Sequence, residues 1–366
     1  MTGQGLEGLK NSLNNYRAFN RSLTKAAICL EFTFGELQSL FFMKQVFIFT
    51  ALLFSVAGSM AQSSLRNLER ITINGSSYVR LREWAAATSF DVRWLKKDEE
   101  LQVTNRFWKL NFTVNSMKTR INGIDVRFSL PVISRNGTVL LPLVDVHNSL
   151  HPLLFPPKNP ASQKIKTICL DPGHGGRDTG KIDKRHLEKK YTLLVAEEIA
   201  QQLRRHGFRV ILTRTKDDFV PLADRPAMAN RNREGLLISL HFNAAENAEV
   251  RGAETYCLTP AGVESSNSGG GRSSAGGLEG NAQNEHNMLL AYQIQKNLVL
   301  LLRQQDRGVK RARYEVLRSA KMPAVLVEAA FMSNTSEAQK IYDPAFRKRM
   351  ATAVVEGILN YKKIVE

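Results

Sequence analysis

The sequence contains little cysteine, and none of its three cysteines stands in a disulfide-like spacing. Cys29 lies near the N-terminus, whereas Cys169 and Cys257 lie inside apolar runs, where a free cysteine packs as a small hydrophobic side chain. A small scaffold held together by disulfides is therefore excluded.

The sequence also lacks an apolar run of the roughly 20 residues that a membrane-spanning helix needs. Residues 46–56 are apolar, but they follow Lys44 and precede Ser59-Met60-Ala61, the small-x-small pattern that signal peptidase reads. We therefore interpret residues 43–61 as a signal peptide that is cleaved after Ala61. The chain is then exported, to the periplasm or cell envelope, and keeps no membrane span.

Residues 1–42 precede a methionine, Met43, that begins a complete signal peptide. We expect translation to start at Met43 and the upstream segment to be an artefact of the assigned start.

Acidic residues are scarce relative to basic ones, with 34 Asp and Glu against 51 Lys and Arg, a formal charge of +17 and a pI near 9.9. This excess indicates an anionic partner: nucleic acid, an anionic membrane surface or an anionic polymer of the cell envelope. The basic residues are scattered through predicted helices, as at Arg204 and Arg205, and no nucleic-acid-binding motif is present. We therefore predict no nucleic-acid partner.

The remaining composition, 43% hydrophobic and 23% charged over 366 residues, is that of a globular chain with room for two domains. Residues 71–155 carry short alternating runs separated by Asn-Gly turns, which predicts a small strand-rich α+β domain. Asn74-Gly75 and Asn136-Gly137, 62 residues apart, each precede a strand and a short helical pattern, which indicates two copies of one hairpin-plus-helix unit. Residues 156–164 are a proline-rich linker.

From residue 165 to 363 predicted strands and helices alternate, which is typical of an α/β layer with a mixed, largely parallel sheet flanked by helices. The predicted strands end at Leu170 or cover residues 209–213, 236–240, 253–258 and 324–328, and the predicted helices cover residues 188–206, 222–233, 288–303 and 344–361. The Gly/Ser-rich stretch within residues 259–285 is too polar to fold alone.

Three potential metal ligands stand at strand ends or at a helix start: His174, Glu188 and His241. Ligands of open α/β sheets gather at the carboxyl ends of the strands. Two imidazoles and one carboxylate make a catalytic zinc shell that leaves a position open for water. A fourth residue, Glu328, ends an apolar strand, where a carboxylate is costly unless it faces a cleft or a partner, so it is the candidate general base.

Singly, each of these residues has an ordinary structural explanation, such as a packed histidine or a helix-capping glutamate. A rival interpretation takes Gly175 to Lys181, GGRDTGK, as a phosphate-binding loop. Ile182 replaces the Ser or Thr that such a loop needs for magnesium, which disfavours nucleotide hydrolysis.

Several motifs resemble those of the zinc-dependent N-acetylmuramoyl-L-alanine amidases of the bacterial cell wall, over residues 165–362. The matching segments are LDPGHGGRDTG, the Glu188-Lys189 helix start, TRTKDDFVPLADRPAMAN, SLHFNA, RGAETY and MPAVLVEAAFMSN. Residues 71–155 loosely resemble the domain first named from the N-terminus of copper amine oxidases. In the last motif, Ala329-Ala330 replaces residues that relatives fill with a threonine or leucine and a glycine.

The resemblance implies Zn²⁺ as cofactor, with His174, Glu188 and His241 as its ligands and Glu328 as the catalytic glutamate. It implies that Asp171, Asn243 and Glu254 support the zinc ligands or contact the substrate. The expected reaction is hydrolysis of the amide bond between N-acetylmuramic acid and L-alanine, in wall remodelling or daughter-cell separation. Peptidoglycan is the expected partner, an activator protein is a further one that the sequence leaves open, and the alternative function is an inactive wall-binding module.

Overall fold

The computed structural model describes residues 68–232, 235–266 and 276–366, which belong to one compact unit, Asn67–Glu366. The interpreted signal peptide, the segment upstream of it and the centre of the Gly/Ser-rich stretch lie outside the described residues. Cys169 and Cys257 are free and buried, as their apolar surroundings predicted. Among the described helices, none is long and apolar enough to cross a membrane.

The small domain contains two related hairpins, one at its start and one near its end, as the repeated Asn-Gly pattern predicted. Asn74 and Asn136 both adopt the left-handed conformation that such turns require. β2 and β8, the second strand of each hairpin, pair antiparallel, with Val79 opposite Leu141. The elements of the two copies are β1 (Ile71–Ile73), β2 (Ser76–Arg80), α2 (Leu81–Ala87), β7 (Ile124–Arg135), β8 (Thr138–Pro142), α3 (Leu143–Asp145), the π-helical turn η1 (Val146–Leu150) and α4 (His151–Leu154).

Between the hairpins, an antiparallel meander extends the small domain, and its strands are β3 (Asp91–Lys96), β4 (Glu100–Thr104), β5 (Lys109–Thr113) and β6 (Ser116–Ile121). β7 then pairs with β15 of the second domain at Val126 and Val309. The hydroxyl of Tyr292 also donates to the carbonyl of Ile121 at 3.0 Å. Through these contacts, β7 covers one edge of the second domain's sheet.

The second domain contains a mixed sheet in the order β12-β9-β13-β16-β14-β15. Its strands are β9 (Thr167–Pro172), β12 (Arg209–Leu212), β13 (Gly235–Asn243), β14 (Ala253–Leu258), β15 (Asp306–Ala312) and β16 (Ala324–Phe331). The first four strands in spatial order run parallel, and β14 is antiparallel to β16. The prediction of a mixed, largely parallel sheet is confirmed.

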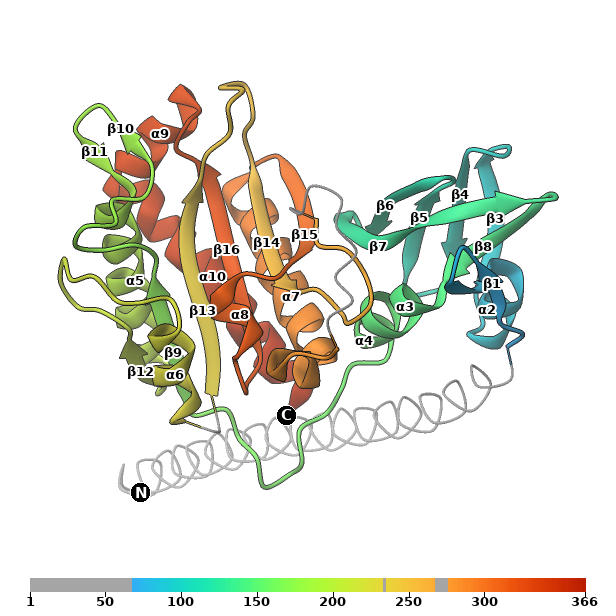
Figure 1. The fold of residues 1–366 in the computed structure, drawn as a ribbon, viewed down its shortest axis with the longest axis horizontal. Coiled ribbons are helices and arrows are strands. Elements are labelled where there is room, and N and C mark those ends of the chain that lie inside the picture. Colours follow the sequence, from blue (N-terminus) through green and yellow to red (C-terminus); the bar gives the residue numbers. More distant parts are fainter. Residues whose placement is uncertain (1–67, 233–234, 267–275) are drawn as a thin grey trace, which may run out of the picture. The chain divides into compact units, whose positions relative to one another are not determined.

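Two long helices, α5 (Glu188–Arg205) and α7 (Asn284–Leu302), pack against this sheet, and a third, α10 (Pro344–Val365), packs on both of them. They lie behind the strands in Figure 1. The short helices α6 (Asp224–Asn230) and α8 (Glu315–Arg318) lie on the front side, and α9 (Thr335–Tyr342) lies near the hairpin of β10 (Ile182–Asp183) and β11 (His186–Leu187) (Figure 1). A 3₁₀ turn, η2 (Glu279–Gln283), precedes α7.

Local sequence signals account for most of these helices. In α5, Tyr191, Val195 and Ile199 are buried at helical spacing and form the stripe that packs on the sheet. α10 begins at Pro344 directly after Asp343, whose carboxylate accepts the Ala345 N–H at 3.0 Å. This pairing of an Asp cap with proline at the first helical position is a strong helix start.

Three predictions of local structure need correction. The helix predicted over residues 222–233 covers only Asp224–Asn230, because residues before it stay in a loop whose Val220 carbonyl accepts from Arg225. Strand β16 continues past Glu328 to Phe331. Strand β15 was not predicted, because its sequence DRGVKRA has four charged residues and a glycine and lacks the alternation that marks a strand.

Candidate active site

The side chains of His174, Glu188 and His241 converge on one point, with a ligand atom of each within 4.8 Å of the others. Oε1 of Glu188 lies 3.0 Å from Nε2 of His174 and 3.2 Å from Nδ1 of His241. Two nitrogens and one oxygen, in a pocket where Glu188 is 4% exposed, form the donor set that catalytic zinc prefers. The residues present therefore fit a zinc ion.

His174 is held on the loop after β9 in a conformation that few non-glycine residues adopt, with φ +63°. Its Nδ1 atom lies 2.9 Å from Oδ1 of Asp178, and this contact turns Nε2 toward Glu188. Burial lowers the pKa of His174, but the carboxylates of Glu188 and Asp178 outweigh it and leave this pKa raised.

Glu188 is the first residue of α5, so its carboxylate lies at the positive end of the helix dipole. It accepts the backbone N–H groups of Lys181 at 2.9 Å and Phe242 at 3.0 Å. Burial raises the pKa of Glu188, but His174 and His241 lower it by more than burial raises it, so the carboxylate stays ionised. Because the Lys181 N–H is bonded to Glu188, the segment from Gly175 to Lys181 is committed to the ligand cluster and does not cradle a phosphate.

The sheet brings the remaining acids to His241. His241 on β13 is in register with Glu328 on β16, and Glu328 is opposite Glu254 on β14. Paired residues on neighbouring strands point to the same face, so the three side chains form one row. Gly173 lies beneath this row, where a Cβ atom would overlap the ring of His241.

Glu328 has an unpaired carboxyl oxygen. Its Oε2 atom is buried and has no hydrogen-bond partner in the described part of the chain. Burial raises the pKa of Glu328 well above its ordinary value, and the charges of Glu188 and Glu254 raise it further. A buried carboxyl with a free oxygen and a raised pKa is suited to taking up and returning protons.

The three residues expected to lie around the ligands occupy different places. Asp171 is buried beneath the sheet end and accepts from Thr213 Oγ1 at 2.6 Å, Ser239 Oγ at 2.7 Å and Arg225 Nη1 at 2.8 Å. Asn243 lines the cavity and donates Nδ2 to Glu254 at 2.6 Å. Asp171 and Asn243 thus both line the cavity, whereas Glu254 is linked to it through its bond to Asn243.

Five residues that bond to this arrangement were not predicted from the sequence: Asp178, Arg214, Arg225, Arg307 and Lys310. Asp178, Arg214 and Arg225 lie within segments that carry the family resemblance, which was the available signal. Arg307 and Lys310 both bond to Glu254 from β15, the strand that lacked a recognisable pattern.

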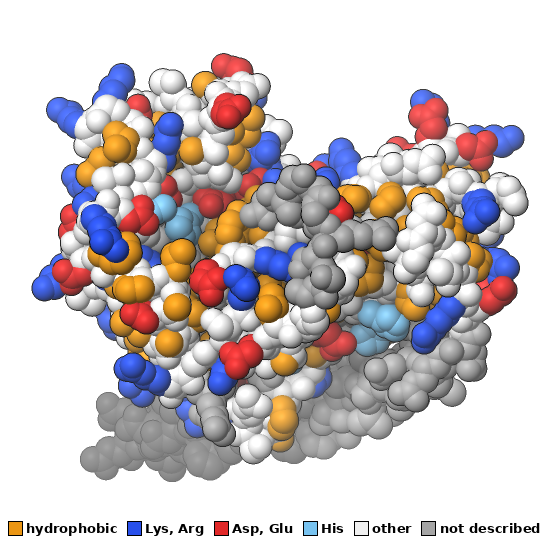
Figure 2. Space-filling model, in the orientation of Figure 1, with side chains coloured by type: hydrophobic (Ala, Val, Ile, Leu, Met, Phe, Trp, Pro, Cys, Tyr) orange, Lys and Arg blue, Asp and Glu red, His pale blue; other side chains and the backbone are white. Residues whose placement is uncertain are grey.

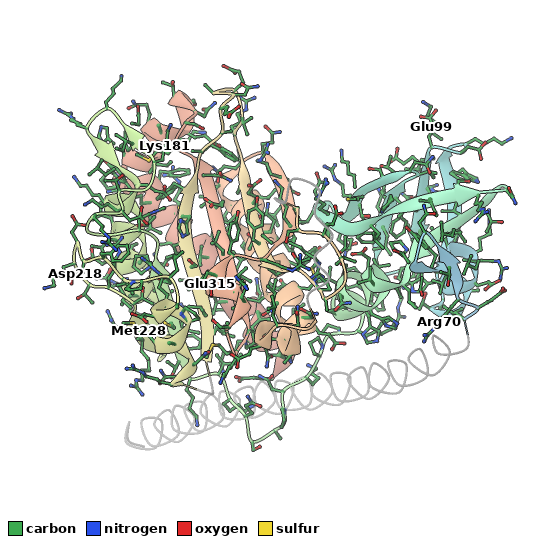
Figure 3. The ribbon with its side chains drawn as sticks, in the orientation of Figure 1. Arg70, Glu99, Lys181, Asp218, Met228 and Glu315 are labelled. Carbon is green, nitrogen blue, oxygen red and sulfur yellow. The ribbon has the colours of Figure 1, made fainter. Side chains whose placement is uncertain are left out.

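The three ligand residues and Glu328 border a cavity of about 400 Å³. Figure 2 shows it as a hollow with histidine at its floor and hydrophobic side chains along its border. The apolar part of the lining includes Leu222, Val316 and Leu326. Lys181 and Glu315, labelled in Figure 3, lie on opposite borders. One side of the cavity is thus polar and metal-binding in character, and the other is apolar.

A mixed α/β sheet with a His–Glu–His cluster and a buried glutamate at its strand ends is an arrangement that fits the class of metal-dependent hydrolases. The profile of the family described as N-acetylmuramoyl-L-alanine amidase matches residues 168–360, and that of the copper amine oxidase N-terminal domain matches residues 63–151. The chain belongs to the N-acetylmuramoyl-L-alanine amidase family.

Similar proteins include YqiI of Bacillus subtilis, an uncharacterized protein, at 32% identity over 54% of this chain and 84% of that protein. N-acetylmuramoyl-L-alanine amidase LytC of B. subtilis is 34% identical, over 56% of this chain and 36% of LytC. N-acetylmuramoyl-L-alanine amidase AmiA of Escherichia coli is 29% identical, over 56% of this chain and 79% of AmiA. Among solved structures, the amidase of Clostridium difficile 630 is 31% identical, with a TM-score of 0.46, over 55% of this chain and 97% of that one.

Proposed function

We propose that this protein is a zinc-dependent peptidoglycan hydrolase that cleaves the amide bond between N-acetylmuramic acid and the L-alanine of the stem peptide. The observation that carries the proposal is the row in which His241 lies beside Glu328. Glu328 lines the same cavity as the three ligand residues, and its buried Oε2 has no hydrogen-bond partner in the described part of the chain. Family membership supplies the bond that is cleaved.

His174, Glu188 and His241 would hold the zinc ion. When bound there, zinc supplies a Lewis acid that polarises the substrate carbonyl and lowers the pKa of water. The chain's own residues orient this cluster: Asp178 fixes the ring of His174, and the N–H groups of Lys181 and Phe242 fix the carboxylate of Glu188.

Glu328 would move the proton. Its carboxylate accepts a proton from the attacking water at Oε2 and returns it to the nitrogen of the departing L-alanine, which leaves as an amine. Because burial and neighbouring carboxylates raise its pKa, Glu328 holds a proton more readily than an exposed glutamate does, as the second step requires.

All four residues of this set are present and assembled, which argues against an inactive wall-binding module. We further propose that the protein acts outside the cytoplasm, because peptidoglycan is there and residues 43–61 have the pattern of an export signal. A role in wall remodelling or daughter-cell separation, and dependence on an activator protein, remain predictions.

The test is incubation of the protein with purified peptidoglycan, with and without a chelator, followed by mass spectrometry of the released peptides. We expect stem peptides with a free L-alanine amino terminus, and we expect them only when metal is present. Release of cut glycan chains, or no release from the metal-loaded protein, would defeat the proposal.

Two variants separate the roles within the site. Glu328→Gln should bind zinc with unchanged stoichiometry yet lose at least about 10²-fold in kcat, the typical contribution of one acid–base group. His174→Ala should lose the metal as well, measured by elemental analysis after dialysis. Peptide release by Glu328→Gln at the unmodified rate would remove Glu328 from the mechanism.

A further inference from the structure

Strand β15 contains an irregularity that turns two cations toward the row of the active site. Arg307 and Lys310 are three residues apart, a spacing that places side chains on opposite faces of a regular strand. The register between β14 and β15 shifts between Ala253 and Thr255, and Gly308 has φ +85°. This bulge brings both side chains to Glu254, which accepts Arg307 Nε at 2.9 Å and is also bonded to Lys310. β-Bulges commonly re-aim side chains beside active sites.

We propose that Arg307, oriented by Glu254, binds a free carboxylate of the stem peptide on the alanine side of the bond that is cleaved. The proposal rests on the amidase function proposed above and assigns the substrate group that this part of the site recognises.

The guanidinium of Arg307 has unused donors. Only its Nε atom is bonded to Glu254, and within the described chain no group bonds to Nη1 or Nη2. Its side chain is 28% exposed and lies over the ring of Phe331, 4.9 Å from the ring centre. A flat guanidinium that is fixed at one edge and stacked on a ring is preorganised to grip a carboxylate with its other edge.

The charge balance around Glu254 also leaves a cation available. Its two oxygens take four donors, from Asn243, Tyr256, Arg307 and Lys310. One carboxylate thus faces two cations, which leaves one net positive charge in the cluster. A substrate carboxylate would balance this charge without displacing any existing bond.

The position of the cluster suits the stem peptide. Glu254 is one strand beyond Glu328 and β15 is one strand beyond Glu254, which places β15 about 10 Å from Glu328 at a spacing of about 4.8 Å per strand. The proposal places the scissile amide beside Glu328 and the residue after L-alanine along this row, toward β15. In peptidoglycan that residue is D-glutamate joined through its side chain, so its α-carboxyl is either a free carboxylate or a carboxamide.

The experiment compares two muramoyl tetrapeptides that differ only in whether this group is a carboxylate or a carboxamide. We expect the unmodified protein to prefer the carboxylate. Arg307→Gln should lose about tenfold to a hundredfold in kcat/KM on the carboxylate substrate, mainly through KM, and change little on the carboxamide. Arg307→Lys keeps the positive charge but not the planar pair of donors, so its kcat/KM on the carboxylate substrate should lie between those of the unmodified protein and Arg307→Gln.

Arg205→Gln, an exposed arginine on the last turn of α5, is the charge-matched control and should behave as the unmodified protein. The proposal is overturned if the unmodified protein shows no preference, or if Arg307→Gln or Arg307→Lys loses equally on both substrates, as a purely structural role of Arg307 predicts. Cleavage of neither substrate by the unmodified protein, and of no peptidoglycan, would instead contradict the amidase function.

Discussion

Arg225 is a buried arginine whose guanidinium is used almost entirely to hold the loop that carries His174. It donates to the carbonyls of Pro172 at 3.0 Å and His174 at 2.9 Å, and to the carboxylate of Asp171 at 2.8 Å. Arg214 binds the same loop at the carbonyls of Pro172 and Gly173. These bonds stabilise a backbone with a left-handed histidine, which would otherwise be strained.

At the residue scale, we predict that Arg225→Lys weakens zinc binding by about tenfold to a hundredfold, the usual effect of losing a residue that orients a ligand. Lysine keeps the positive charge but cannot reach three acceptors with one rigid fork. The measurement is competition for zinc against a chromophoric chelator. Arg209→Lys, on the exposed side of β12, is the control, and an unchanged zinc affinity in Arg225→Lys would refute the role.

At the scale of elements, the site depends on strands that meet edge to edge more than on any one helix. β13, β16 and β14 each add one residue to a single row, and β15 adds two cations at its end, beside Glu254. Burial raises the pKa of Glu254, but Lys310, Tyr256 and Arg307 together lower it by more, so the net shift of this pKa is downward. Glu254 therefore stabilises the fold as a carboxylate.

We predict that Glu254→Gln lowers the free energy of unfolding by about 3 kcal/mol at pH 7, because two cations then lack their partner. Since the pKa of Glu254 is lower in the folded chain than in the unfolded chain, its contribution is complete above the ordinary glutamate pKa of about 4.3. This contribution is lost as the pH falls through the folded value. The difference between variant and unmodified protein should therefore shrink in acid.

Urea unfolding at pH 7 and at about pH 3, with metal-free protein, measures this difference. Glu246→Gln, which changes an exposed carboxylate after β13, is the control and should cost little at either pH. A difference that stays constant or grows in acid would contradict the assigned direction of the shift.

At the scale of the whole molecule, the formal charge of +17 is the property most relevant to a wall substrate. Cell-wall polymers that carry carboxylates or phosphates attract such a chain over distances set by the salt concentration. The site itself is not uniformly basic, since Glu188, Glu254 and Glu328 lie at its centre. We therefore expect the excess charge to contribute to attraction to the wall more than to chemistry.

We predict that binding to intact wall sacculi weakens steeply as salt rises from about 0.1 M to about 1 M, over which the Debye length falls from about 10 Å to about 3 Å. Co-sedimentation with sacculi measures the bound fraction, and sacculi stripped of anionic polymers are the control. Binding that is equally strong at both salt concentrations would show that charge does not carry the attraction.

Much of this molecule could be predicted from residue patterns. An apolar run followed by glycines and a histidine marks the end of β9 and the loop after it, and buried runs such as GLLISL mark the central strands. The order of strands and helices predicted the sheet type. β15 could not be predicted, because a strand covered by β7 and bent at Gly308 can carry charges that an isolated pattern assigns to a loop.

The sequence by itself determined the candidates for chemistry: His174, Glu188, His241 and Glu328 are residue types that bind metal or move protons, at positions that end strands or begin a helix. Only the tertiary structure decided which arginines matter. From the sequence alone, Arg225 and Arg307 would be taken for exposed residues, because most arginines in proteins are exposed. Their roles come from partners that other strands supply, and the register between those strands depends on side-chain packing across the whole sheet.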